Sequence, residues 1–577
     1  MGRQPIDIDF TLRRVFGKKS FRPLQREVIL SAIEGHDVFL QAATSFGKSL
    51  CFQLPAVVSH GVTVVVSPLL SLMVDQVASL EAKSIPVATI NSTTPKSKRR
   101  DILKDILSGH PVTRLLYVTP ELCQTEFFRN SIRTVHSQGE LARIAIDEAH
   151  CVSEWGHDFR PAYKALSWFR QELKSPTVPI TALTATATER VRNEIISLLG
   201  LNPSTVRKFG TSSARPNIHY EVKYFPEIPN YIEDIMNDPN AHRLQQSQID
   251  DLISWLEAIH NRRQASLAVR NKAIPNSKDL TEPVIPPMCG IIYVPLRALC
   301  EEIAAQLKDC AIPNLRAVAY HAGLPATERE KVQSMWSAPR KKPNRAGVSA
   351  TNRQTQQPLS FDIIVATNAF GMGIDNPHVR FVVHWTVPRT FEGFVQESGR
   401  AGRDGCAAIS LVYYTPSECE RIIDRIRRGN EGASDTVKVN KRPFGRMNAA
   451  EGQDGKLMNQ KAILKSFENV VKYCETTTKC RHAVIQEFSD DLESELARQK
   501  SNPQSTAPVT ESQMSLGKSI ACDYACDFCK EGSIVLTKRM RSRLQYDPAF
   551  KGGHEESTFF HNGNAYMDRY GVYDEYE

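Results

Sequence analysis

The first residues that could do chemistry are 42–49, which follow the apolar run DVFLQ and end in Gly-Lys-Ser. Apart from Ala42 in place of the first glycine, they fit the phosphate-loop pattern G-x-x-x-x-G-K-[ST]. In such a loop, backbone N–H groups at a helix N-terminus bind phosphate oxygens. We expect Lys48 to lie at the β and γ phosphates and Ser49 to offer its hydroxyl to Mg²⁺.

A pair of carboxylates follows another apolar run. Asp147 and Glu148 come directly after LARIAI (141–146). Ligands bind at the carboxyl ends of parallel strands, so we expect Asp147 to hold Mg²⁺ and Glu148 to orient or deprotonate an attacking water. The alternative is an exposed acidic turn. The phosphate-loop pattern about a hundred residues upstream favours the nucleotide site.

Three cysteines near the C-terminus have metal-ligand spacing. Cys522, Cys526 and Cys529 form C-x3-C-x2-C in CDYACDFC. This pattern indicates a tetrahedral zinc site that needs a fourth ligand from elsewhere. The alternative is a set of free thiols. The chain has 13 cysteines, and without a secretory signal we expect them to be reduced.

Two regions must position these groups, one at about 20–210 and one at about 215–428. Each alternates short Val- and Ile-rich runs with helix-length amphipathic segments, which predicts buried parallel strands in a doubly wound α/β lobe. The first region contains the runs at 62–68, 114–120, 141–148 and 180–186, and the second those at 290–295, 317–323, 361–367, 379–385 and 408–414.

Several segments break this pattern. Residues 225–285 are polar, with a possible helix at 247–260, and 337–360 contain five basic residues and no acid. Residues 429–459 and 499–519 have linker composition. We therefore predict a first lobe at 1–212, a second lobe at 213–428 with insertions near 225–285 and 337–360, a linker at 429–459, a zinc-binding domain at 460–535 and a flexible tail at 536–577.

The bulk properties set few limits on function. The net charge of +8 permits nucleic-acid binding without demonstrating it. The N-terminus has no apolar core of the kind a signal peptide needs, and the longest apolar stretch, at 61–74, is too short to span a membrane. We expect a soluble intracellular protein with no membrane partner.

Further motifs occur in a fixed order along the chain: FGKKSFRPLQREVI (16–29), SPLLSLMVDQV (67–77), YVTPE (117–121), DEAH (147–150), TALTATAT (181–188), GIIYVPLR (290–297), AYHAGL (319–324), IVATNAFGMGID (364–375) and QESGRAGRDG (396–405). From about residue 10 to 530 the series resembles the RecQ family of superfamily 2 DNA helicases. The cysteine segment is most similar to the fifth animal RecQ paralogue and its fungal relatives. The resemblance implies two tandem RecA-like lobes, a small helical zinc-binding domain, and ATP, Mg²⁺ and zinc as cofactors.

The resemblance also implies roles at the nucleotide. Arg22 and Gln25 look like the residues that read the adenine. Arg400 and Arg403, which we place three apart on a helix start, resemble arginine fingers that stabilise charge on the γ-phosphate. The other residues expected at the nucleotide or in the cleft between the lobes are Thr44, Ser45, Phe46, Gly47, Gly371, Asp375 and Gln396.

For DNA, the most discriminating segment is CVSEWGHDFRPAY (151–163), which resembles the family's aromatic-rich loop that couples single-stranded DNA contact to hydrolysis. Trp155 and Phe159 have side chains that stack on bases, and Arg160 can contact phosphate. His157 and Ser67 complete the expected DNA-binding set.

The resemblance points to Cys480, in Cys-Arg-His at a helix start, as the fourth zinc ligand. Cys474 is the competing ligand and His482 a weaker one. A site filled by four protein ligands implies a structural role.

The expected function is that of an ATP-dependent 3′–5′ helicase or translocase on single-stranded and branched DNA, acting in recombination, repair and replication in the nucleus. Three positions depart from the family: Ser45 and Phe46 stand where most members have glycine, and Glu154 replaces glutamine. They motivate one alternative, a catalytically weakened DNA-binding scaffold of the same fold. An RNA helicase of the same superfamily is the other.

Overall fold

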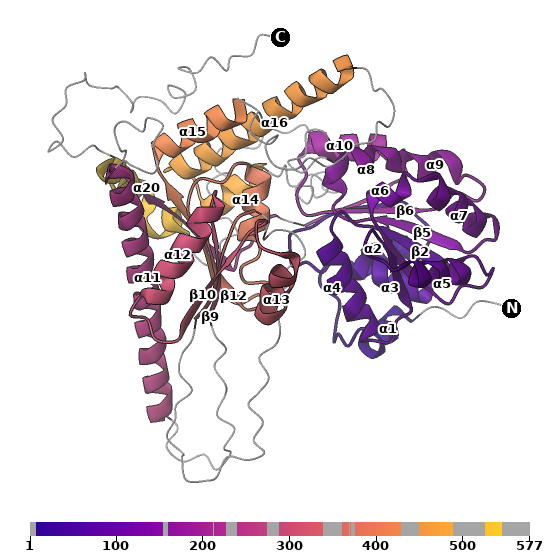
Figure 1. The fold of residues 1–577 in the computed structure, drawn as a ribbon, viewed down its shortest axis with the longest axis horizontal. Helices are drawn as coiled ribbons and strands as arrows, with labels where there is room; N and C mark the ends of the chain where they lie inside the picture. Colours follow the sequence, from indigo (N-terminus) through magenta and orange to yellow (C-terminus); the bar gives the residue numbers. More distant parts are fainter. Residues whose placement is uncertain are drawn as a thin grey trace, which may run out of the picture.

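The computed structural model describes residues 7–153, 160–211, 213–226, 239–273, 288–337, 361–368, 370, 376–427, 449–488 and 526–544. Two parallel sheets, each covered by helices on both faces, form two lobes side by side (Figure 1). The first lobe is drawn in indigo and purple, and the second in magenta to yellow. The predicted α/β class with two doubly wound lobes is confirmed.

The first sheet has the strand order β3-β4-β2-β5-β6-β1-β7, and its strands pair in parallel. Successive residues of a strand point to opposite faces. Accordingly, Val64 and Val66 lie in one core cluster and Val65 in another. The strands are β1 (Val38–Gln41), β2 (Val62–Val66), β3 (Val87–Ile90), β4 (Leu115–Val118), β5 (Leu141–Ile146), β6 (Ile180–Thr184) and β7 (Arg207–Gly210).

The helices of the first lobe connect these strands and cover both faces of the sheet. They are α1 (Ile8–Arg14), α2 (Gln25–Ile33), α3 (Leu50–Val58), α4 (Leu70–Glu81), α5 (Lys96–Ile106), α6 (Pro120–Cys123), α7 (Glu126–Ser137), α8 (Pro161–Lys164), α9 (Trp168–Glu172) and α10 (Glu189–Leu198), with 3-10 turns η1 (Ala149–Val152) and η2 (Ala165–Ser167).

The second sheet has the order β10-β11-β9-β12-β13-β8, again with parallel pairs. Its strands are β8 (Ile218–Tyr224), β9 (Met288–Tyr293), β10 (Leu315–Tyr320), β11 (Phe361–Ala366), β12 (Val379–His384) and β13 (Ala408–Tyr414). The helices are α11 (Pro239–Ala273), α12 (Arg297–Asp309), α13 (Ala326–Ser337), α14 (Phe391–Ser398), α15 (Pro416–Arg427), α16 (Ala449–Glu475), α17 (Arg481–Phe488) and α20 (Asp527–Leu544).

Every strand predicted from an apolar run is present. The edge strands β3, β7 and β8 were not predicted. β7, RKFG, has no apolar run, and β8, IHYEVKY, alternates buried and half-buried residues because one face of the strand is less covered. The helix suggested at 247–260 is confirmed and extends over Pro239–Ala273. Its Leu252 and Leu256 are buried in the core of the second lobe.

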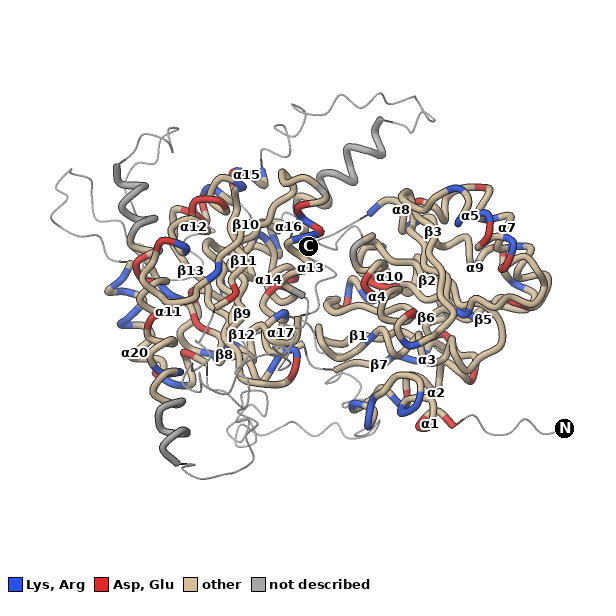
Figure 2. Tube along the Cα trace, turned by 60° about the horizontal axis from the view of Figure 1, so that its bottom comes forward, with Lys and Arg blue, Asp and Glu red and all other residues tan. Residues whose placement is uncertain are grey.

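Charged residues lie mainly on the outer helices, where Figure 2 shows basic and acidic residues interspersed on both lobes. Within the described part of the chain, no helix combines the length and the apolar character needed to cross a bilayer. The basic segment predicted at 337–360 lies, apart from Ser337, outside the described residues.

The three helices of the cysteine region share a hydrophobic core with the second sheet. Phe467 of α16, Ile485 of α17 and Leu536 of α20 are buried in one cluster with Val382 and Val412 of the sheet. Two helices cross the predicted boundaries. α16 begins at Ala449, inside the predicted linker, and α20 continues to Leu544, inside the predicted tail. The polar composition of both stretches gave no signal for these helices.

Helix α20 also covers the free edge of β8. The Asp527 carboxylate accepts a hydrogen bond from the Val222 N–H at 3.1 Å, and Arg539 donates to the Val222 carbonyl at 3.2 Å. Arg481 of α17 pairs with Asp527 at 2.9 Å, and both side chains are almost fully buried. This network satisfies an edge that would otherwise expose unpaired backbone groups.

Removing the Asp527 carboxylate should be costly, because it leaves the Arg481 guanidinium buried without a counter-charge. We expect Asp527→Ala to destabilise the second lobe by about 3–5 kcal/mol, measured by urea unfolding. The matched control is Glu126→Ala, which breaks an exposed pair with Arg133 and should change stability far less than Asp527→Ala does. Equal effects for the two variants would contradict this role.

Candidate functional site

The phosphate loop connects the end of β1 to the start of α3. Gly47 has φ +85°, and a Cβ atom there would lie 2.7 Å from the Gln25 amide nitrogen, so glycine is required. Ser45 has φ +75°, a left-handed conformation that costs a non-glycine residue about 1–2 kcal/mol. Phe46 lies outside that region and packs on the first-lobe core. Of the two departures from glycine, only Ser45 strains the backbone.

Gln25, expected at the adenine, supports the phosphate loop. Its amide nitrogen donates to the Phe46 carbonyl at 2.8 Å and to the Gly47 carbonyl at 3.3 Å. Its amide oxygen accepts the Arg22 N–H at 2.9 Å. The Arg22 side chain itself is exposed. Gln25 thus contacts the loop directly, and the Arg22 backbone is bonded to Gln25.

Lys48 lies beneath the loop with its ammonium turned to backbone oxygens. Nζ donates to the Ala42 carbonyl at 2.8 Å and to the Ala43 carbonyl at 3.4 Å. Burial lowers the pKa of Lys48, and the carboxylates of Glu148 and Asp147 oppose that shift. The ammonium therefore stands in poorly solvated surroundings that favour an anionic ligand.

Asp147 lies at the carboxyl end of β5, close to the phosphate loop, as predicted. Burial and the neighbouring Glu148 raise the pKa of Asp147 to about 7, while Lys48 acts in the opposite direction. Gln76 of α4 lies close enough to the carboxylate to lower its pKa. A buried carboxylate of this kind gains strongly from a divalent cation.

Glu148 follows in a left-handed conformation, with φ +49°. Its carboxylate lies 3.3 Å from the ring of buried His150, and that ring lies 3.0 Å from the Thr184 hydroxyl at the end of β6. The Tyr163 hydroxyl donates to the Asp147 carbonyl at 3.0 Å. These contacts hold the acidic pair against β6 and against the segment that follows 154–159.

The second lobe brings Arg400 and Arg403 to the same cleft, but not on a helix start. Helix α14 ends at Ser398, and a turn follows in which Gly402 (φ +58°) and Gly405 (φ +82°) are left-handed. The helix-start prediction is therefore wrong, because the glycines end the helix. Arg403 lies close enough to lower the pKa of Lys48, although burial of Lys48 contributes more.

Arg400 and Gln396 are both buried. Among the described residues, Nε and Nη1 of Arg400 and the amide nitrogen of Gln396 have no hydrogen-bond partner. Buried donors of this kind are costly unless a ligand or a neighbouring segment satisfies them. The unsatisfied donors are consistent with the prediction that Arg400 and Gln396 lie beside a ligand between the lobes.

Direct hydrogen bonds join the lobes at the phosphate loop. The Thr44 hydroxyl donates to the Gly399 carbonyl at 3.0 Å. Arg215, between the two sheets in sequence, donates to the Thr44 and Gly399 carbonyls, each at 3.1 Å. A Cβ atom on Gly399 would collide with the Thr44 hydroxyl, so the close approach requires glycine there.

The cleft is strongly cationic. Burial lowers the pKa of Arg215, and the nearby positive charges of Arg403 and Arg22 lower it further. Arg403 also acts on Lys48, which lies beside the acidic pair, so these four cationic side chains are neighbours at the junction of the lobes. Such an arrangement suits a polyphosphate with a bound divalent cation.

Some predicted site residues lie outside the described residues: Trp155, His157, Phe159, Gly371, Asp375 and Cys522. Arg160 is described, and it donates to the Pro68 carbonyl at 2.6 Å. Ser67, predicted to bind DNA, is fully buried, and its role at DNA stays a prediction.

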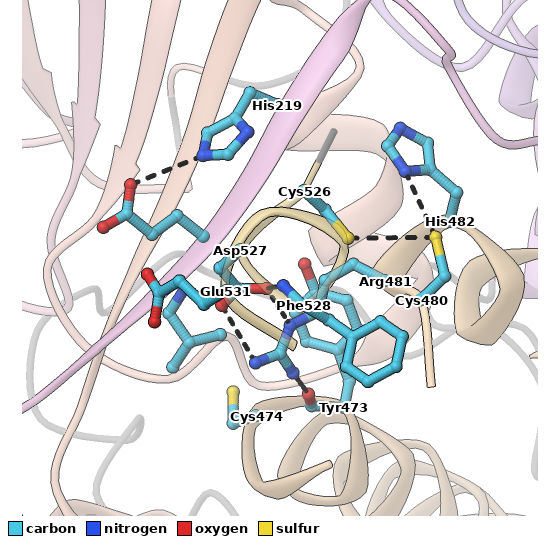
Figure 3. A network of polar contacts seen from close by, with 12 residues as sticks. His219, Tyr473, Cys474, Cys480, Arg481, His482, Cys526, Asp527, Phe528 and Glu531 are labelled. Atoms are coloured by element: carbon cyan, nitrogen blue, oxygen red, sulfur yellow. Dashed lines mark hydrogen bonds and ion pairs between the residues drawn. The ribbon is translucent and has the colours of Figure 1, made fainter. Parts of the chain in front are cut away.

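The cysteine cluster lies where α17 and α20 begin (Figure 3). Sγ of Cys480 and Sγ of Cys526 are 3.8 Å apart, and the Cys529 thiol lies within 4.8 Å of both. Cys474 lies on the other side of the Arg481–Asp527 pair in Figure 3 and is not in this group. His482 Nδ1 lies 3.8 Å from Cys480 Sγ.

These residues fit a zinc ion. Thiol–thiol distances near 4 Å match ligands around one tetrahedral metal. The Cys480 thiol and burial raise the pKa of Cys526 to about 11. A bound cation would reverse that shift, because it stabilises the thiolate. The geometry favours Cys480 over Cys474 as the ligand from outside the C-x3-C-x2-C motif.

Three residues of the site were not predicted: Gln76, Thr184 and Arg215. Gln76 and Thr184 fall inside quoted motifs, SPLLSLMVDQV and TALTATAT, without a local signal of their contacts. Arg215 is a single arginine in a polar stretch, and its partners lie far away in sequence. Neither periodicity nor spacing could identify it.

Comparisons with known proteins agree with this arrangement. Residues 22–195 match the family of DEAD/DEAH box helicases, and residues 285–405 match the helicase conserved C-terminal domain. Among solved structures, the DEAD-box helicase Mss116 bound to ssRNA and UDP-BeF has a TM-score of 0.51 at 12% identity, covering 90% of this chain and 97% of that chain. This likeness shows the fold.

Named RecQ proteins match over most of the chain. The rat ATP-dependent DNA helicase Q5 is 34% identical, covering 83% of this chain and 42% of its own length. The ATP-dependent helicase SGS1 of Saccharomyces cerevisiae is 34% identical, covering 85% of this chain and 28% of its own length. The chain thus spans less than half the length of these two relatives. It belongs to the RecQ family of helicases.

Proposed function

We propose that this chain is an ATP-dependent DNA helicase. It would hydrolyse ATP, move 3′ to 5′ along single-stranded DNA and separate duplexes, with branched DNA among its substrates. We place its work in recombination, repair and replication in the nucleus. The named DNA helicases to which the chain is similar support this proposal.

One observation carries this proposal: the phosphate loop of the first lobe meets the turn of the second lobe that carries Arg400 and Arg403, here called the arginine turn. Thr44 and Gly399 are hydrogen-bonded, and Arg403 lies close enough to Lys48 to lower its pKa. When a site is built from two lobes, a movement of one lobe changes the distances between its catalytic groups. Closure around ATP and opening after hydrolysis can therefore be coupled to movement along a strand.

The residues take separate roles in this proposal. Lys48 and the loop N–H groups bind the phosphates, Glu148 positions or deprotonates the attacking water, and Arg400 and Arg403 stabilise the charge that develops on the γ-phosphate. Ser49 and Asp147 would hold Mg²⁺, which supplies charge neutralisation on the phosphates. Zinc would bind Cys480, Cys522, Cys526 and Cys529 in a structural role.

DNA binding is proposed along the segment that follows the acidic pair. Trp155 and Phe159 lie in sequence between η1 and Arg160, whose backbone N–H donates to the carbonyl of Cys151, the residue after the DEAH motif, at 3.0 Å. Stacking and backbone contacts would make binding salt-sensitive and largely independent of sequence.

The first prediction concerns turnover. We expect Glu148→Gln to lower DNA-stimulated ATP hydrolysis by about 10²–10⁴-fold while ATP binding is retained, and Lys48→Ala to weaken both. The control is Lys83→Ala, at an exposed lysine bonded only within its own helix turn. Steady-state ATPase with single-stranded DNA, single-stranded RNA or neither is the measurement.

Each outcome separates the proposal from its alternatives. Hydrolysis stimulated by DNA and lost in Glu148→Gln supports the motor. Binding of DNA without turnover in the wild-type protein would indicate the catalytically weakened scaffold, with strained Ser45 as the first residue to change to glycine. Stronger stimulation by RNA than by DNA would favour the RNA helicase.

The second prediction concerns pH. Because the pKa of Asp147 is raised to about 7, this acid is largely protonated at pH 6, and Mg²⁺ must displace its proton. We expect the apparent Mg²⁺ affinity to rise by up to about tenfold per pH unit below pH 7 and to level off above it. Mg²⁺ titrations followed by thermal unfolding at pH 6, 7 and 8 test this. A pH-independent affinity, or one equal in Asp147→Asn, would contradict it.

The third prediction concerns zinc. We expect Cys480→Ser, Cys522→Ser and Cys526→Ser each to reduce bound zinc, whereas Cys474→Ser retains about one equivalent. The exposed Cys406 provides the neutral control. Metal content by elemental analysis is the measurement. Loss of zinc in Cys474→Ser but not in Cys480→Ser would reverse the assignment.

A further inference from the structure

Arg215 makes a set of contacts that its place in the sequence does not explain. Its side chain is buried, and its two terminal nitrogens donate to three carbonyl oxygens from both lobes. Nη1 reaches Thr44 in the phosphate loop and Gly399 at the end of α14. Nη2 reaches Gly402 in the arginine turn at 2.6 Å. One guanidinium thus joins the loop that binds phosphate to the turn that carries Arg400 and Arg403.

A histidine of helix α17 contacts the backbone of Arg215. His482 of α17 is fully buried, and its Nε2 lies 3.2 Å from the Arg215 carbonyl and 3.0 Å from the Ile218 carbonyl. Both partners only accept, so Nε2 carries the proton and donates. Nδ1 then faces the Cys480 thiol at 3.8 Å. A ring contact with Tyr220 further restricts the imidazole.

These contacts form a continuous path from the cysteine cluster to the phosphate loop. We propose that Arg215 is a positioning residue for nucleotide binding, and that His482 holds it in place from the cysteine-bearing helix. The inference rests on the proposed ATP-dependent function. It makes the cysteine region a support of the nucleotide site as well as of the second lobe.

The contacts of Arg215 indicate an action through the phosphate loop and the turn. Its Nη1 and Nη2 donate to oxygens of Thr44, Gly399 and Gly402, and Nη2 also lies 3.4 Å from the side-chain oxygen of Asn217. Ser45, next to Thr44, is strained, so the loop needs an external support to keep its shape. A bidentate guanidinium gives that support a fixed geometry, which the single ammonium of lysine cannot copy.

The test compares Arg215→Gln, Arg215→Lys and His482→Ala in protein checked for full zinc content and an unchanged far-ultraviolet circular dichroism spectrum. A fluorescent ATP analogue is titrated to obtain Kd, and KM and kcat for ATP are measured with single-stranded DNA. The matched control is Arg170→Gln, at a partly buried arginine that pairs with Asp37 in the first lobe.

We expect Arg215→Gln to raise Kd for the analogue by about 10- to 100-fold, Arg215→Lys to restore only part of it, and Arg170→Gln to leave Kd unchanged. His482→Ala should shift Kd in the same direction, with an effect much less than additive in the double variant. A Kd within about twofold of wild type for Arg215→Gln, or full additivity with His482→Ala, would overturn the inference.

The titration separates this inference from the proposed function. If the wild-type protein binds the analogue but does not hydrolyse ATP, the helicase proposal fails, while the Kd comparison still decides the role of Arg215. If hydrolysis is normal and Kd is unaffected in Arg215→Gln, only the positioning role is excluded.

Discussion

Backbone carbonyl oxygens from both lobes converge on the Arg215 guanidinium, and this convergence joins the phosphate loop to the second lobe. Carbonyl groups are weak partners for a buried cation unless several act together, and here three do so within hydrogen-bond distance. The approach is possible only because Gly399 has no side chain to meet Thr44. The phosphate loop contacts Arg215 through Thr44, the turn of the second lobe contacts it through Gly399 and Gly402, and Arg403 lies close by.

The strands of both sheets were predictable where burial on both faces demands continuous apolar runs, as at 62–66 and 361–366. The edge strands β7 and β8 were not predicted, because their residues are only partly buried and form no continuous apolar run. In β8, Val222 finds its partners on Asp527 and Arg539, some three hundred residues away. No local pattern reports such a partner.

The site residues likewise fall into those that local sequence identifies and those that it does not. Lys48, Asp147 and the cysteines follow from spacing, because local sequence shapes the turn that presents each of them. Arg400 and Arg403 were expected on a helix, but Gly399, Gly402 and Gly405 place them in a turn. Arg215 and Gln76 depend on contacts between distant elements, which sequence spacing does not encode. The roles of the aromatic loop and of Cys522 remain predictions from sequence.

The pairing of β8 with α20 has a consequence for synthesis of the chain. The strands of the first lobe lie between Val38 and Gly210, so that lobe can acquire its sheet early on the ribosome. The second lobe begins its sheet at Ile218 but obtains the helix that covers this edge only when residues 527–544 have emerged. After β13 (Ala408–Tyr414) has been made and has paired with β8, the other edge of β8 keeps unpaired backbone groups until α20 has been made.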